Sequence, residues 1–377
     1  MRITGGTVFD LDRGFVERDL YTDGAHFTVS PAGGQTLDAT GCYVIPGLVD
    51  VHFHGCVGED FSDATPDGLQ AMADYELSQG VTYICPAGMT LPEDQLRRIC
   101  ENAAAHRAKA TSGAYLAGLN LEGPFLCAAK KGAQNGAFLH DPDGDMLHRL
   151  QQAAGGLVKL VTVAPEQPGA LPFIASARAD GITVSVGHTT ADYDTALAAF
   201  QAGARQATHL FNAMPPFTHR APGVIGAAFD TPDVRAELIC DGFHIAPATL
   251  RIAFRILGED RTVIVSDAMM ASGLADGDFE LGGQTVYVRD GKALLADGTI
   301  AASTTNLYDE FRNVLRFGIP FRQALKSCTI NPARVIHADK ETGSIAQGKR
   351  ADLLVLDRNM EIRMVIVKGE IVVNHEA

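Results

Sequence analysis

Residues 46–56 read PGLVDVHFHGC, an apolar run that leads into Asp50 and then into two histidines, His52 and His54. Side chains of a β-strand alternate between its two faces, so these three side chains share one face if the segment is extended. Two imidazoles on one face are well placed to hold a transition metal. Taken alone, the motif is more simply interpreted as a pair of surface histidines after a strand. The rest of the chain has to decide between this interpretation and a metal site.

Strand and helix signals alternate after this motif. Eight apolar segments are predicted strands, at residues 48–51, 81–85, 114–121, 157–163, 182–186, 204–207, 237–240 and 262–265. Helices are predicted between and after them, at residues 92–109, 171–179, 191–202, 246–257 and 305–317, with others opening after Thr65 and at Asn331. This order predicts an α/β fold, a (β/α)8 TIM barrel. A doubly wound open sheet is the alternative, but no Gly-x-Gly-x-x-Gly motif follows the first strand.

The two ends of the chain lack this alternation. Residues 1–46 and 346–377 contain short apolar segments separated by polar, glycine-containing turns, which predicts β-strands. We expect them to pack together as one small β-sandwich module, with residues 47–345 forming a metal-dependent barrel. Two separate flaps are the alternative, and they would leave edge strands exposed. Residues 276–301 also break the alternation and are predicted to be a β insertion near the end of the barrel.

Charge and cysteine content limit the classes of partner. The chain has 377 residues and a net charge of -14, which argues against nucleic-acid binding because a phosphate backbone requires a basic surface. Its seven cysteines form no C-x-x-C motif, so we expect reduced thiols in a cytoplasmic protein. The N-terminus has no apolar signal core, and no apolar run is long enough to span a bilayer, so no membrane partner is expected.

Side chains that can bind metals stand at or shortly after the ends of six predicted strands. They are His52, His54, Glu122, His188, His209, His244 and Asp267. In a barrel the carboxyl ends of all strands meet on one face, where active sites are built. Each residue alone has a simpler explanation, as a turn residue or, for Asp267, as a helix N-cap. Together they favour a metal site, because nitrogen and oxygen ligands suit Zn²⁺ or Fe²⁺.

Seven motifs carry a resemblance to a known family. They are PGLVDVHFHG, LEGPF, GHT, THLFNAM, DGFH, VSDAM and GSIAQGKRADLLVLD. Together they resemble the amidohydrolase superfamily and, within it, the N-acetylglucosamine-6-phosphate deacetylases. His-x-His and the late Asp specify only the superfamily, whereas LEGPF, THLFNAMPPF and DGFH are more specific to the deacetylases. The resemblance implies hydrolysis of the acetamide of N-acetyl-D-glucosamine 6-phosphate, to glucosamine 6-phosphate and acetate, in amino-sugar catabolism. It also implies a homodimer.

The resemblance also implies which residues hold metal. Glu122 is expected to be the carboxylate ligand, with His188 and His209 as its partners at one site. His52 and His54 match the pair that completes a second site. We therefore expect one or two divalent ions, Zn²⁺ or Fe²⁺, and favour two because this pair is present.

Further roles follow from the same resemblance. Asp267 is expected to be the general acid and base and to contact a metal, and His244 to polarise the acetyl carbonyl. Backbone N–H groups at Asn212 and Ala213, together with Arg220, are expected to hold the phosphate. The resemblance leaves two alternatives for Arg220, action within its own chain or across a dimer interface.

Two positions depart from the family pattern. Gln134, a position near the substrate, stands where the family usually has His, and Ala221 stands where it usually has Glu. An amide can form hydrogen bonds but carries no charge. These changes leave a second epimer, N-acetylgalactosamine 6-phosphate, as an alternative substrate, and another amide hydrolase of the superfamily as an alternative activity. A non-catalytic protein on the same fold is disfavoured because every ligand position is filled.

Overall fold

The barrel is built from parallel strands. The computed structural model describes residues 1–30 and 34–375. The barrel strands are β8 (Leu48–Asp50), β11 (Val81–Ile84), β12 (Ala87–Gly88), β13 (Tyr115–Leu116), β14 (Leu119–Leu121), β15 (Val158–Val163), β16 (Thr183–Val186), β17 (Gln206–Ala207), β18 (Arg235–Ile239) and β19 (Thr262–Val265). They form two sheets, in the orders β13-β11-β8 and β12-β14-β15-β16-β17-β18-β19, and every pairing within them is parallel. The predicted α/β fold is therefore confirmed, and these parallel sheets fit a TIM-like barrel.

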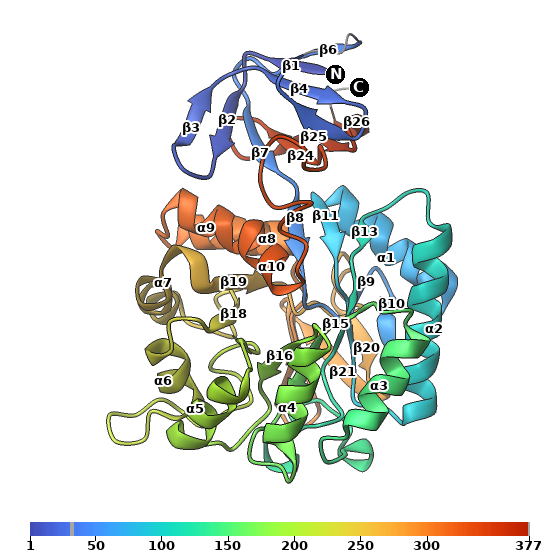
Figure 1. Ribbon diagram of the computed structural model, residues 1–377, viewed down its shortest axis with the longest axis vertical. Coiled ribbons are helices and arrows are strands. Elements are labelled where there is room, and N and C mark those ends of the chain that lie inside the picture. Colours follow the sequence, from blue (N-terminus) through green and yellow to red (C-terminus); the bar gives the residue numbers. More distant parts are fainter. Residues whose placement is uncertain (31–33, 376–377) are drawn as a thin grey trace.

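Helices surround the strands (Figure 1). They are α1 (Pro66–Ser78), α2 (Glu93–Lys109), α3 (Gly144–Ala153), α4 (Ala170–Ala179), α5 (Tyr193–Ala202), α6 (Gly223–Asp230), α7 (Pro247–Arg261), α8 (Leu307–Arg316), α9 (Phe321–Cys328) and α10 (Ile330–Val335). Residues of α10 pack with Val49, Leu160 and Val263 of the strands in one buried cluster. No helix within residues 1–30 and 34–375 is long and apolar enough to cross a membrane.

Strands from both ends of the chain share one sheet. Its order is β26-β25-β24-β7-β2-β3, from β2 (Thr7–Asp10), β3 (Gly14–Glu17), β7 (Tyr43–Pro46), β24 (Leu353–Leu356), β25 (Ile362–Val367) and β26 (Glu370–Asn374). A second sheet holds β1 (Arg2–Thr4), β4 (Leu20–Asp23), β5 (His26–Thr28) and β6 (Thr36–Asp38). Ile3, Val8, Leu353 and Ile366 lie in one buried cluster that includes residues of both sheets. Figure 1 shows these sheets over one end of the barrel. Residues 31–33 and 376–377, which fall in the predicted module, lie outside the described residues.

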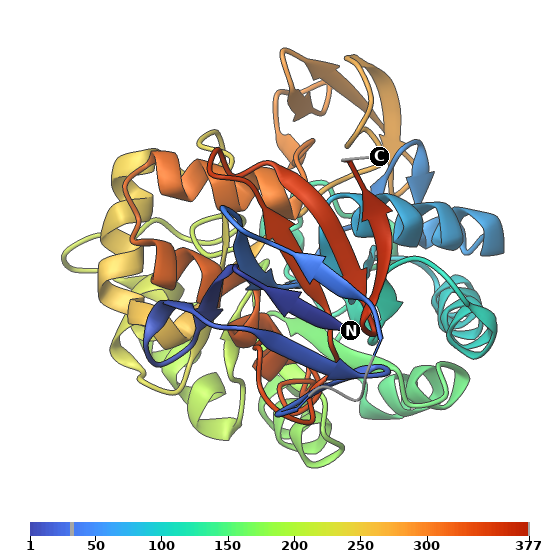
Figure 2. The ribbon, with the colours of Figure 1, turned by 90° about the horizontal axis from the view of Figure 1, so that it is seen from above.

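An antiparallel sheet interrupts the barrel between β19 and α8. It consists of β20 (Gly277–Leu281), β21 (Gln284–Arg289), β22 (Lys292–Leu294) and β23 (Ile300–Ala302). Figure 2 shows it projecting from one side of the molecule. Its buried residues Leu281, Val286 and Val288 pack with Met89 and Ala133 of the barrel loops. A short hairpin, β9 (Gly55–Cys56) with β10 (Glu59–Asp60), follows the His-x-His motif.

Six of the seven cysteines are buried free thiols, as the sequence predicts. The opening motif departs slightly from its expected form, because β8 ends at Asp50 and the two histidines follow it outside the strand. Asp50 accepts a hydrogen bond of 2.6 Å from the Ser266 hydroxyl. The Asp50 carboxylate is thus held beside β19, and the metal-binding groups described below do not include it.

Candidate active site

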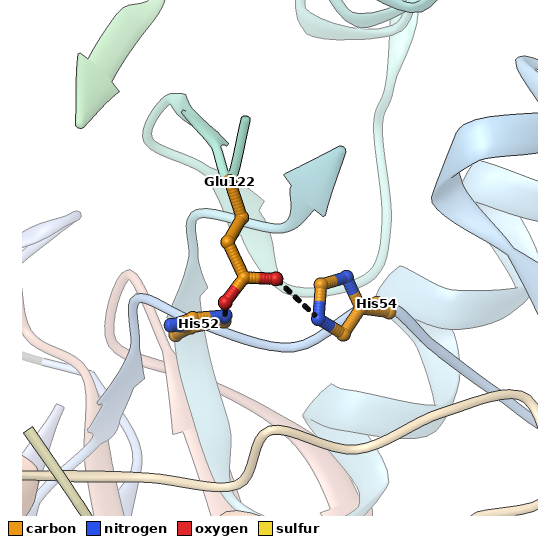
Figure 3. A group of neighbouring side chains, drawn as sticks. All are labelled: His52, His54 and Glu122. Atoms are coloured by element: carbon orange, nitrogen blue, oxygen red, sulfur yellow. Dashed lines mark ion pairs between the residues drawn. The ribbon is translucent and has the colours of Figure 1, made fainter. Parts of the chain in front are cut away.

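Glu122 lies at the centre of the candidate site, directly after β14. Its Oε1 is 3.1 Å from Nε2 of His188 and 2.9 Å from Nε2 of His209. Its Oε2 is 3.2 Å from Nε2 of His54, and its Oε1 is 3.4 Å from Nε2 of His52. Figure 3 shows the carboxylate facing the rings of His52 and His54. One buried carboxylate therefore faces four imidazoles.

These five residues form two groups that could each hold an ion. One group is His52, His54 and Glu122, and the other is Glu122, His188 and His209. The ligand atoms within each group lie within 4.8 Å of one another, and every residue is buried. Glu122 belongs to both groups. Five of the six residues predicted to contact metal, all except Asp267, thus come together in these groups.

The contacts of the other ring nitrogens set the tautomers. Nδ1 of His54 is 3.1 Å from the carbonyl oxygen of Ala87, and Nδ1 of His188 is 2.8 Å from that of Lys130. A carbonyl oxygen only accepts hydrogen bonds, so each Nδ1 carries the hydrogen. Each Nε2 is therefore the nitrogen that faces Glu122 and can bind a metal once its own proton is released.

Ligand atoms consequently lie close to one another in the cluster. Nε2 of His188 is 3.1 Å from Nε2 of His209, and both nitrogens face the same carboxylate oxygen. Nε2 of His52 is buried and has no hydrogen-bond partner among the described residues. Lone pairs at this spacing repel unless a positive charge lies between them. Imidazole nitrogen and carboxylate oxygen are suitable ligands for a divalent transition metal, so the residues fit one.

Electrostatics of the cluster agree with this fit. Burial raises the pKa of Glu122, but the neighbouring His52 and His188 outweigh burial and hold that pKa well below its usual range. Burial lowers the pKa of His54, whereas its hydrogen bonds to Asp267 and Glu122 raise it to about 10. The cluster keeps its carboxylate ionised and attracts positive charge to the space between its ligand atoms.

Three site residues adopt backbone conformations that are rare for residues other than glycine. The φ angles of His188, His209 and Asp267 are 46°, 25° and 47°. Each residue stands at the carboxyl end of a strand, where a left-handed backbone turns the chain sharply out of the sheet. Such conformations cost free energy and cluster at functional sites. Here they bring side chains from separate strands to one point.

Asp267 and His244 flank the cluster. Oδ1 of Asp267 is 3.2 Å from Nε2 of His54 and 3.7 Å from Nε2 of His52. Nδ1 of His244 lies 2.6 Å from Oδ2 of Asp241, which fixes the ring and puts a hydrogen on Nδ1. Both Asp267 and His244 line the pocket that holds the cluster.

The pocket has the size of a small-molecule site. Its volume is about 510 Å³. Asp297 and Thr299, in the loop between β22 and β23, line part of it, so the β insertion contributes to the wall. Lys130 and Lys131 also line it and bring positive charge into a protein of net charge -14. An anionic small molecule can therefore be attracted locally.

The Amidohydrolase family matches residues 43–372, most of the chain. The chain belongs to the amidohydrolase family.

Relatives of this amidohydrolase span nearly its whole length. It is 36% identical over 332 residues to the N-acetylglucosamine-6-phosphate deacetylase of Bacillus subtilis (strain 168), covering 87% of this chain and 84% of the relative. It is 29% identical over 350 residues to the N-acetylgalactosamine-6-phosphate deacetylase of Escherichia coli O157:H7, covering 93% of both chains. A mutant N-acetyl-D-glucosamine-6-phosphate deacetylase from Mycobacterium smegmatis, solved in complex with N-acetyl-D-glucosamine-6-phosphate, is 34% identical, with a TM-score of 0.92 and 99% of each chain covered.

Not every residue that the sequence marks for substrate reaches the pocket of this amidohydrolase. Asn212 and Ala213 line it, but the backbone N–H of Asn212 donates to the carbonyl of His209 over 2.9 Å. That N–H already donates within the chain, and the phosphate role of Asn212 stays a prediction. Arg220 is exposed and lines a separate depression with Tyr193 and Pro215. Within one chain, Arg220 does not face the pocket.

Two residues of the amidohydrolase site were not singled out from the sequence. Glu237 contacts His52 from β18, with 2.9 Å between Oε2 and Nδ1, and Asp241 contacts His244. Glu237 lies in a predicted strand and carries no motif, although a charged residue inside an apolar strand is itself a signal. Asp241 is the first residue of DGFH, so its motif was noted but its role was not.

Proposed function

We propose that this amidohydrolase is an N-acetylglucosamine-6-phosphate deacetylase, which hydrolyses the acetamide of its substrate to give glucosamine 6-phosphate and acetate. The observation that carries the proposal concerns Glu122. This residue belongs to both buried ligand groups and lines one pocket with Asp267 and His244. Deacetylases at 36% and 34% identity over most of the chain support the same reaction.

Two divalent ions are proposed, Zn²⁺ or Fe²⁺. Glu122, His188 and His209 would hold one, and His52 and His54 would hold the other together with Glu122. When bound, such an ion supplies Lewis acidity, which activates water and polarises a carbonyl. The donor set of imidazole and carboxylate suits either metal.

Asp267 is proposed to move the proton. Its carboxylate lies beside the ligand cluster, 3.2 Å from Nε2 of His54, and it lines the pocket where a substrate amide would bind. The hydrogen bond to His54 and the charge of His52 outweigh burial and lower the pKa of Asp267, so it starts as a base. It accepts the proton of the attacking water and returns it to the leaving amine nitrogen.

His244 is proposed to donate a hydrogen bond to the acetyl carbonyl oxygen. Nδ1 already donates to Asp241, so donation from Nε2 requires a ring that carries both hydrogens. The ionised Asp241 supplies the compensating negative charge at 2.6 Å. A donor aimed at the developing oxyanion is worth about 3 kcal/mol in the transition state.

Phosphate recognition is proposed to involve the backbone N–H of Ala213 and Arg220. The exposed position of Arg220, outside the pocket of its own chain, supports a homodimer in which it reaches the neighbouring pocket. Gln134 is proposed to lie near the sugar, since it lines the same pocket. The free thiols are consistent with a cytoplasmic protein. We also propose a β-sandwich module of residues 1–46 and 346–377, beside a barrel domain of residues 47–345 with its β insertion at 276–301.

The alternative substrate is N-acetylgalactosamine 6-phosphate, because the relative from Escherichia coli is a deacetylase of that sugar phosphate. A deacetylation panel separates the two: both N-acetylhexosamine 6-phosphates and their dephosphorylated forms, with the protein loaded with Zn²⁺ or Fe²⁺. We expect the highest kcat/KM on N-acetylglucosamine 6-phosphate. A higher kcat/KM on N-acetylgalactosamine 6-phosphate would make that sugar the substrate. No release of acetate from any of the four compounds would reject the reaction.

A further inference from the structure

A buried carboxylate contacts the cluster from behind. Glu237 on β18 is 0% exposed, and its Oε2 lies 2.9 Å from Nδ1 of His52. The same oxygen accepts the backbone N–H of His209 over 3.1 Å. The side-chain amide of Gln206 donates to its Oε1. Glu237 thus joins one histidine of each candidate metal group.

This contact fixes the tautomer of His52. A carboxylate only accepts, so Nδ1 carries a hydrogen and Nε2 is left as the nitrogen whose lone pair can bind a metal. That lone pair is buried, has no hydrogen-bond partner among the described residues, and lies 3.4 Å from Oε1 of Glu122. It has the orientation and chemistry of a metal ligand.

His52 differs from the other ligand histidines. Nδ1 of His54 and Nδ1 of His188 contact backbone carbonyls, and Nδ1 of His209 has no hydrogen-bond partner among the described residues. A carboxylate partner makes the imidazole a stronger base, and thus a stronger ligand, than a carbonyl does. The candidate site that contains the His-x-His motif therefore has a ligand histidine supported by a carboxylate, which the other site lacks among the described residues.

A purely structural role does not require this charge. A fully buried carboxylate loses its hydration, which costs free energy unless an opposite charge compensates it. Within the described part of the chain, His52 is the ion-pair partner that lies within 4.0 Å of Glu237. An amide oxygen would accept the N–H groups of His52 and His209 at lower cost, with the side-chain amide of Gln206 turned to present its oxygen. The negative charge of Glu237 stabilises the imidazole of His52 when that ring donates electron density to a bound cation.

We propose that Glu237 is a positioning residue that sets the affinity of the His52–His54–Glu122 site for its ion, and hence whether the chain holds one ion or two. This inference rests on the proposed metal-dependent function.

The test measures metal binding rather than turnover. Chelator-stripped protein is equilibrated with buffered Zn²⁺ at a series of free concentrations, and bound zinc per chain is counted. The intact chain is expected to bind two ions. In Glu237→Gln the affinity of one ion should fall about 10–100-fold, while the other affinity stays unchanged. In His52→Ala that ion should be lost, and Glu237→Gln should add no further loss in the His52→Ala background.

A matched control separates the metal effect from the loss of a buried carboxyl. Glu76 on α1 is also 0% exposed, and neither carboxyl oxygen has a hydrogen-bond partner among the described residues. Glu76→Gln should leave both zinc affinities unchanged. If Glu237→Gln fails to fold by circular dichroism, Glu237→Asp keeps the charge but shortens its reach, and it should weaken the same ion alone.

The outcomes distinguish this inference from the proposed function. Unchanged zinc affinities in Glu237→Gln, or equal loss of both ions, would overturn the inference and leave the metal site intact. One ion per intact chain at every zinc concentration would also overturn it, while deacetylation could still proceed. No bound zinc in the intact chain would reject the proposed function itself.

Discussion

The side-chain amide of Gln134 donates a hydrogen bond of 2.7 Å to Oε2 of Glu122. Its carbonyl oxygen accepts the backbone N–H of Thr90, also over 2.7 Å. An amide is suited to this place, because it donates to a carboxylate and accepts from an N–H at once. Gln134 therefore holds the carboxylate that both candidate metal groups share, in addition to lining the pocket.

Gln134→Leu should lower both zinc content and activity. The change keeps the volume but removes the donor to Glu122 and leaves the N–H of Thr90 without its partner. We expect kcat/KM to fall about 10–100-fold, as when groups that orient metal ligands are lost. Zinc per chain and kcat/KM measured on the same preparation test this. Full activity with normal zinc content would show that Glu122 does not depend on the amide.

Asp267→Asn should abolish turnover while zinc is largely retained. The amide keeps the shape of the side chain but cannot accept a proton from water, so kcat should fall at least about 10²–10⁴-fold. Zinc content measured beside kcat separates proton transfer from metal loss. Near-normal turnover in this variant would reject the role of Asp267.

Asp241→Asn should lower kcat through His244. The contact of 2.6 Å between Oδ2 and Nδ1 would lose the negative charge that strengthens it and orients the ring. We expect a fall in kcat of about 10²-fold with KM little changed. In a His244→Ala background the same change should have no further effect on kcat. An equal fall in both backgrounds would place Asp241 outside this pathway.

Arg220→Ala should raise KM for the phosphorylated substrate. The guanidinium is proposed to pair with phosphate, and a charge-assisted hydrogen bond contributes about 1.5–3 kcal/mol. Kinetics on N-acetylglucosamine 6-phosphate and on N-acetylglucosamine provide the comparison. A similar loss on both sugars would contradict a phosphate role.

Glu76→Gln should stabilise the protein increasingly as pH rises above about 4.5. Burial raises the pKa of Glu76 well above its usual range, and the charge of Asp50 adds to this. The folded state therefore binds a proton that the unfolded state releases, and stability falls as pH rises between the two pKa values. Each pH unit in that interval costs about 1.4 kcal/mol, which the amide avoids. Thermal melts of both proteins at pH 5 and pH 8 test this, and an equal difference at both values would contradict it.

The sequence predicted the barrel because apolar strands leave strong local signals. It did not predict α6, whose sequence GVIGAAFD contains two glycines, a residue type that disfavours helices. The helix forms because most of its residues are buried against the barrel. α3 and α9 were also absent from the prediction, although Asp143 caps α3 through two backbone N–H groups.

The metal ligands could be predicted because their types and their positions at strand ends are both visible in the sequence. The contacts behind them could not. Glu237 and His52 are 185 positions apart, and the direction of a side chain inside a closed barrel depends on the packing of all its strands. The engaged N–H of Asn212 likewise depends on a local turn that includes the left-handed His209.

The most direct measurement is acetate release from N-acetylglucosamine 6-phosphate by one preparation of the protein, first stripped by chelator and then reloaded with Zn²⁺ or Fe²⁺. We predict no turnover in the stripped protein, and restored release of one acetate per glucosamine 6-phosphate after reloading. Full turnover without metal, or no acetate from this substrate after metal has been counted in the protein, would contradict a metal-dependent deacetylase.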